Sequence, residues 1–100
     1  MTKTKTTQTR EIIRSKDFRR SFKRYLKSGI DIKVDLEDIL NILVTYNQIP
    51  MKYRDHQLEN CKDFKNCREL HVKPNLLLVY RLSDSSIELL QLGSHSDLFD

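Results

Sequence analysis

The sequence has few of the residues that interrupt a chain or cross-link it. It holds two glycines, two prolines, two cysteines and no tryptophan in 100 residues. So few glycines exclude a glycine-rich phosphate-binding loop. Cys61 and Cys67 show neither the Cys-x-x-Cys spacing of zinc and redox motifs nor the density of a disulfide-rich secreted domain. We therefore expect free thiols in a reducing compartment.

Long apolar runs are absent as well. No stretch approaches the ~20 apolar residues that span a bilayer. Residues 1–8 are mostly Thr and Lys and lack the apolar segment of a signal peptide. We expect a cytoplasmic protein with no membrane partner. A chain this short forms one domain, so we predict a flexible segment over residues 1–9 and a single domain over residues 10–100.

Charge is what the sequence has in quantity. It carries 18 Lys and Arg against 14 Asp and Glu, a net charge of +4, and such an excess suits a polyanionic partner. A helix is predicted from an N-cap at Ser15 to a stop at Gly29. Its polar side is either a solvated charged face or a surface that contacts phosphates. Five basic residues recur there at helical spacing: Lys16, Arg20, Lys23, Arg24 and Lys27.

The rest of the chain predicts a second helix and then a sheet. Helical spacing continues over residues 33–46 and ends before Pro50, and residues 52–66 read as a loop. Apolar alternation then predicts a meander of strands over residues 68–72, 76–82 and 87–92, with a further short strand at 11–14. The fold class is α+β, with an N-terminal helical hairpin packed on a small, mainly antiparallel sheet.

Three histidines at the edges of these segments are the candidate catalytic residues: His56, His71 and His95. A neutral imidazole can accept or donate a proton near pH 7, as cleavage of RNA through its 2'-hydroxyl requires. His71 is out of phase with Leu70 and Val72, so it should face away from the side that those residues bury. The three positions can meet at one edge of the sheet, although each taken alone is also an ordinary surface position.

Zinc binding is the competing use of the histidines and cysteines, but their spacings match no compact zinc motif. We therefore predict no metal site and no cofactor.

The candidate RNA-binding residues are mostly cationic. Arg68 and Arg81 lie on neighbouring predicted strands and Lys62 flanks them, so guanidinium groups can stabilise charge on a phosphate held between histidines. Phe99 either stacks on an unpaired base or plugs the C-terminal end of the core. Tyr80, inside an apolar run, is expected in the core.

Four blocks of the chain, taken together, resemble the YafQ branch of the RelE/ParE toxin superfamily. They are Tyr53–Leu58, Phe64–Pro74, Leu77–Arg81 and Leu92–Phe99, and the resemblance covers roughly residues 10–99. It implies a RelE/ParE-like fold and a toxin of a type II toxin–antitoxin pair. The activity it implies is that of an endoribonuclease that cuts messenger RNA in the ribosomal A site.

The resemblance also implies roles for particular residues. His95 falls on the general acid that protonates the leaving 5'-oxygen, while His56 and His71 fall on groups that activate the 2'-hydroxyl or steady the phosphate. Phe99 falls on the terminal aromatic of the family.

Two neighbouring positions depart from the family pattern. The family usually has an aspartate, often followed by an aromatic, where this chain has Asn75 and Leu76. Asn75 can still form hydrogen bonds with RNA, but it cannot act as a carboxylate base.

The partners implied are an acidic antitoxin, messenger RNA on the ribosome and ribosomal RNA, with operator DNA contacted only through the antitoxin complex. Two other readings stay open. In the first, the chain is a catalytically impaired family member that acts mainly as an antitoxin-binding co-repressor. In the second, it is a gyrase poison like the ParE toxins, whose activity does not depend on histidines.

Overall fold

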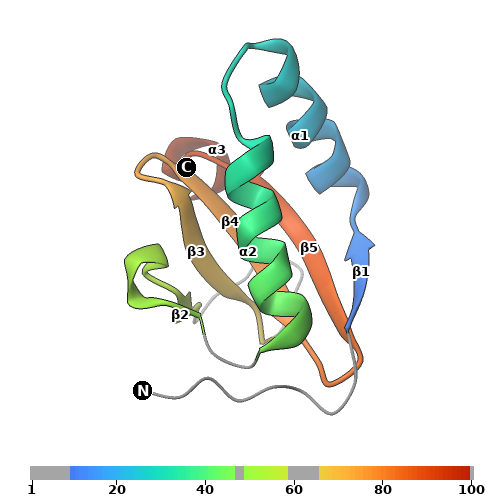
Figure 1. The fold of residues 1–100 in the computed structure, drawn as a ribbon. Coiled ribbons are helices and arrows are strands. Elements are labelled where there is room, and N and C mark those ends of the chain that lie inside the picture. The colour runs from blue at the N-terminus through green and yellow to red at the C-terminus, as the bar shows by residue number, and fades with distance from the viewer. Residues whose placement is uncertain (1–9, 47–48, 59–65, 100) are drawn as a thin grey trace.

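The protein combines three α-helices with a five-stranded sheet in the computed structural model, which describes residues 10–46, 49–58 and 66–99. The sheet order is β1-β5-β4-β3-β2, with β1 parallel to β5 and the other pairs antiparallel (Figure 1). This confirms the predicted α+β class and meander. In chain order the elements are β1 (Glu11–Arg14), α1 (Lys16–Lys27), α2 (Lys33–Thr45), the 3-10 helix η1 (Met51–Tyr53), β2 (His56–Gln57), β3 (Arg68–Lys73), β4 (Leu76–Leu82), β5 (Ser86–Gly93) and α3 (His95–Phe99).

The helical hairpin starts and stops where the sequence predicts. The Ser15 hydroxyl accepts the backbone N–H of Phe18 at 3.0 Å and donates to the carbonyl of Leu90 at 2.7 Å. One side chain therefore caps α1 and ties it to β5. Gly29 adopts φ +84° after α1, a conformation that few other residues tolerate.

The main core lies between α2 and one side of the sheet, here called the helix face. Figure 1 shows α2 running across the strands and α1 lying alongside β5. The alternation of the strands places every second residue on this face. The buried residues of this core include Phe18, Leu36, Ile39, Leu43, Leu70, Leu78, Tyr80, Ile87, Leu89 and Leu92.

The opposite side of the sheet, here called the second face, has a smaller buried cluster. Cys67, Val79 and Leu90 are buried there, and Leu58 and Leu98 pack against them. Cys67 is disulfide-bonded, so the expectation of free thiols is wrong for this residue. Spacing in sequence excludes a metal motif, but it does not report whether the folded chain brings sulfur atoms together.

The segment predicted as a loop over residues 52–66 includes regular secondary structure. It contains the end of η1 and the two-residue strand β2, so the prediction is wrong for these positions. Such a short strand has no hydrophobic period of its own and exists because it pairs with β3. The segments over residues 1–9 and 59–65 lie outside the described residues. Within the described part of the chain, no helix is long and apolar enough to cross a membrane.

Arg10 joins the end of α2 to the sheet from a nearly buried position, 6% exposed. Its guanidinium donates to the carbonyls of Leu43 and Tyr46 at 2.9 and 3.0 Å and to the carbonyl of Ser83 at 2.7 Å. The last carbonyls of a helix have no partner within the helix. Arg10 supplies two of those partners and links them to the turn between β4 and β5.

We predict that Arg10→Met lowers the free energy of unfolding by about 2–4 kcal/mol, because buried carbonyl oxygens lose their donors. Arg19→Met, on the exposed side of α1, should change it by no more than about 0.5 kcal/mol. Urea denaturation of both variants measures the difference. Equal losses from the two substitutions would contradict this role for Arg10.

Candidate active site

The strand register brings His71 and His95 to one end of the sheet. His71 is paired with Leu77 on β4, and Leu77 is paired with Gly93 on β5. Two strand spacings separate His71 from Gly93, about 10 Å, and His95 begins α3 two residues later. His71 is half-buried and His95 is exposed. Both imidazoles can therefore be reached from solvent at this end.

His56 lies on β2, directly opposite Glu69 of β3. It is thus a diagonal neighbour of His71, about 7–8 Å away by the geometry of antiparallel strands. Its Nε2 atom is 3.5 Å from Glu69 Oε1, and its Nδ1 atom is 3.0 Å from the carbonyl oxygen of Arg54. Both neighbours are acceptors, so the ring satisfies both only when both nitrogens carry hydrogen.

Glu69 is a buried carboxylate, 2% exposed. Its Oε2 atom has no hydrogen-bond partner among the residues that the structure describes. A carboxylate in such a position strongly favours a nearby cation. In the sequence, only the alternation of the strand pointed to Glu69, which has the same phase as His71.

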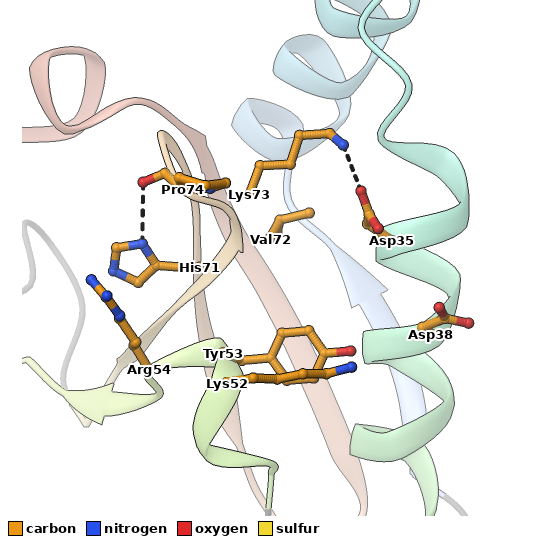
Figure 2. A pocket seen from close by; sticks show the side chains of 9 residues that line it. All are labelled: Asp35, Asp38, Lys52, Tyr53, Arg54, His71, Val72, Lys73 and Pro74. Carbon is orange, nitrogen blue, oxygen red and sulfur yellow. Dashed lines mark hydrogen bonds and ion pairs between the residues drawn. The ribbon is translucent and has the colours of Figure 1, made fainter.

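His71 makes a different contact. Its Nδ1 atom lies 3.4 Å from the carbonyl oxygen of Pro74 (Figure 2). When Nδ1–H donates to this carbonyl, the neutral ring keeps its lone pair on Nε2. That nitrogen is suited to accept a proton.

A cleft of about 400 Å³ opens beside His71, between α2, η1 and β3. Arg54 lines the same cleft, and Figure 2 shows its guanidinium beside the His71 ring. Arg54 adopts φ 53° and is exposed. Arg54 was not among the residues predicted from the sequence. A strand prediction at β2 would have pointed to it, because Arg54 lies two residues before His56 and so has the same phase. The cleft is lined by Asp35, Asp38, Lys52, Tyr53, Arg54, His71, Val72, Lys73 and Pro74.

Arg68 belongs to a network on the helix face. Its Nε and Nη2 atoms donate to Asp55 Oδ2 at 3.1 and 2.7 Å, and the Tyr80 hydroxyl donates to the other oxygen of the same carboxylate. The hydrogen bond to Asp55 raises the pKa of Arg68. Burial, and then the bond to Asp55, raise the pKa of Tyr80. The network fixes Asp55, and with it the short segment that carries Arg54 and His56.

Arg81 lies on the second face and pairs with Glu88 at 2.7 Å, an interaction that raises the pKa of the guanidinium. It is four residues along β4 from Leu77, about 13 Å. Since Arg68 is opposite Tyr80 in the register, Arg68 and Arg81 leave opposite faces of the sheet. At most one of the two guanidinium groups can therefore face a phosphate held on either side of the sheet.

The other predicted RNA-binding residues fall in three places. Asn75 is exposed in the turn between β3 and β4, directly after Pro74, whose carbonyl faces His71. Phe99 is the last residue of α3. Lys62 lies outside the described residues.

A reciprocal pair of hydrogen bonds starts α3. The Ser94 hydroxyl accepts the N–H of Asp97 at 3.2 Å, and the Asp97 carboxylate accepts the N–H of Ser94 at 3.3 Å. This is a capping box, and His95 lies inside it. A Cβ atom at Gly93 would be 3.0 Å from Asp97 Cβ, so the glycine permits this close turn. The signal Ser-x-x-Asp was present in the sequence, but α3 is too short to show a helical period.

A family model described as "Bacterial toxin of type II toxin-antitoxin system, YafQ" matches residues 10–100. The chain belongs to the YafQ toxin family. The predicted family is thereby confirmed.

Particular relatives agree with this assignment. "mRNA interferase toxin YafQ" of Escherichia coli (strain B / BL21-DE3) is 30% identical over 91 residues, 90% of this chain and 96% of the relative. The toxin family thus includes named mRNA interferases, which are endoribonucleases, as the sequence predicts.

Solved structures show the same fold. The crystal structure of the E. coli DinJ–YafQ complex matches with a TM-score of 0.78 at 30% identity, over 91% of this chain and 99% of that chain. A metal-bound toxin from Helicobacter pylori matches with a TM-score of 0.78 at 38% identity, over 92% of this chain and 100% of that one. Among residues 10–46, 49–58 and 66–99 of this chain, no three His, Cys, Asp or Glu residues are grouped to hold a metal ion.

We predict that high pH destabilises the protein through Tyr80. A raised pKa in the folded state means that the unfolded chain loses this proton first, so stability is complete below the ordinary tyrosine pKa of 10.0 and falls above it. The free energy of unfolding of the wild type should drop relative to Tyr80→Phe by about 1.4 kcal/mol per pH unit above 10. Urea titrations between pH 8 and 11 measure this; a constant difference would contradict the assignment.

Proposed function

We propose that this protein is a toxin that cleaves messenger RNA on the ribosome, without a metal ion, through proton transfer by its histidines. The observation that carries the proposal is the row from His71 through Leu77 to Gly93, which supports placing His71 and His95 at one end of the sheet. Membership of the YafQ family supports messenger RNA as the substrate.

The reaction follows from the groups available. His71 Nε2 takes the proton of the 2'-hydroxyl, and the 2'-oxygen attacks the adjacent phosphorus in line. The bond from phosphorus to the 5'-oxygen breaks, and His95 donates a proton to that oxygen. The products are a 2',3'-cyclic phosphate, which opens to a 3'-phosphate, and a 5'-hydroxyl end.

Two groups support this step. His56 is held between the Arg54 carbonyl and Glu69. The Arg54 guanidinium lines the cleft beside His71. Charge that builds on the phosphate oxygens in the transition state is stabilised by such preorganised groups.

The remaining predicted residues bind RNA farther from the scissile bond. Asn75 offers an exposed amide in the turn after Pro74, and Phe99 and Lys62 are assigned to base stacking and phosphate contact from the sequence. Arg68 and Arg81 are held by carboxylates on opposite faces, so their contacts with RNA are peripheral. Asn75 in place of the family's aspartate also leaves proton transfer to the histidines.

The antitoxin is the proposed regulator. The E. coli relative was crystallised as a complex with DinJ, and we assign this chain a small acidic partner that covers its basic surface and alone contacts operator DNA. Charge pairing makes such a complex form quickly and depend on salt. Co-repression without catalysis and gyrase poisoning remain the alternatives that the following assay separates.

We predict that His95→Ala and His71→Ala each lower cleavage at least about 100-fold, because each removes a proton-transfer group. Expression of the toxin alone, with primer extension of transcripts on translating ribosomes, should give codon-phased cuts for the wild type and none for the variants. Gln57→Ala, exposed beside His56 on β2, serves as the matched control and should cut normally. Intact messages with the wild type would favour co-repression or gyrase poisoning.

We further predict different defects for two arginines. Arg54→Ala should lower the single-turnover rate about 10-fold or more at saturating ribosomes, because the lost contact forms with the transition state. Arg81→Ala should mainly raise the ribosome concentration needed for half-maximal rate. Equal losses of the maximal rate in Arg54→Ala and Arg81→Ala would contradict the different roles assigned to the two arginines.

A further inference from the structure

The carboxylate of Asp97 contacts three residues from two parts of the chain. Its Oδ2 atom accepts the Ser94 N–H at 3.3 Å and the Tyr25 hydroxyl at 3.3 Å, and lies 3.6 Å from the guanidinium of Arg24. Tyr25 and Arg24 belong to α1. We call these four residues the Asp97 clamp.

We propose that Asp97 is a positioning residue for His95: by holding the first turn of α3 against α1, it fixes the imidazole toward the scissile linkage. This rests on the proposed function, in which His95 is the proton donor. The clamp encloses His95, since Ser94 precedes it and Asp97 follows it by two residues.

α3 needs such an anchor because it is only five residues long. A helix of this length has no independent stability, so its direction comes from contacts outside it. Leu98 packs against the cluster on the second face, which fixes one side of the helix. The Asp97 clamp fixes the other side, toward α1.

The carboxylate is suited to this role at neutral pH. The hydrogen bond from the Ser94 backbone lowers the pKa of Asp97, with further contributions from the Ser94 and Tyr25 side chains and from Arg24. Asp97 therefore stays ionised, accepts hydrogen bonds from the Ser94 N–H and the Tyr25 hydroxyl, and pairs with Arg24. Asp17 and Arg20 of α1 line the same hollow as Asp97.

The clamp is exposed, so its effect should appear in rate more than in global stability. Exposed ion pairs contribute little to folding, whereas a displacement of about 1 Å at a reacting group can cost about 100-fold in rate. A residue that only stabilised the fold would show the opposite pattern.

The test uses purified full-length toxin in single-turnover cleavage of messenger RNA on ribosomes. Asp97→Ala should lower the maximal rate about 10- to 100-fold and change the half-saturating ribosome concentration by less than about threefold. Asp97→Glu should recover most of the rate, because glutamate also completes a capping box. Tyr25→Phe should show a smaller loss, and Asp84→Ala, an exposed carboxylate in the turn between β4 and β5, should match the wild type.

The position of the His95 ring gives a second readout. The imidazole carbon–proton NMR signals of His95 should shift in Asp97→Ala and Tyr25→Phe and return in Asp97→Glu, while those of His56 stay unchanged. If Asp97→Ala fails to fold, Tyr25→Phe decides, and a wild-type rate with an unmoved His95 signal overturns the proposal.

The outcomes also separate this inference from the proposed function. Full activity of His95→Ala would remove the proton donor itself. Loss of activity in His95→Ala together with full activity in Asp97→Ala would overturn only the positioning role.

Discussion

The register of β3, β4 and β5 is the constraint on which the site depends. Leu70 lies opposite Leu78, which lies opposite Leu92, and all three are buried beneath the helices. Side chains alternate between the faces of a sheet, so a slip of one residue would expose these leucines and bury His71. The core that stabilises the fold therefore also sets which end of the sheet receives His71 and α3.

The charged groups divide between scaffold and site. Arg10 donates its hydrogen bonds to carbonyls at the end of α2, and Asp55 accepts hydrogen bonds from Arg68 and Tyr80. Such satisfied networks keep the polar groups of a small interior from destabilising it. Arg54, by contrast, presents its guanidinium to the cleft beside His71. The hydrogen bonds of Arg10 and Asp55 therefore keep the site rigid, although these residues take no part in the proposed reaction.

The parts of the fold that sequence predicts are those with a local signal. Ser15 and Gly29 bound α1, and the phase of His71 against its leucine and valine neighbours was correct. The two-residue strand β2 has no such signal, because pairing with β3 creates it. Because β2 was not predicted, neither the position of Arg54 beside His71 nor the pairing of His56 with Glu69 was predicted.

The register between neighbouring strands could not be predicted from the sequence either. Arg68 and Arg81 sit on neighbouring strands, yet the register places them on opposite faces. Irregularities near Lys73 and Tyr80 shift the pairing further, and a bulge of this kind is fixed by packing across the sheet. The Ser-x-x-Asp pattern of the capping box at Ser94 is visible in the sequence. The helix that follows it was not predicted, because one turn is too short to show a helical period.

The proposed mechanism requires His71 and His95 to act on one phosphodiester bond. A double-mutant cycle in single-turnover cleavage on ribosomes tests this most directly, with His71→Ala, His95→Ala and the combined variant. Two groups that serve one concerted step give losses that do not multiply, so the combined variant should be no slower than the slower single variant. Losses that multiply in full would show that the two histidines act independently and would contradict the account.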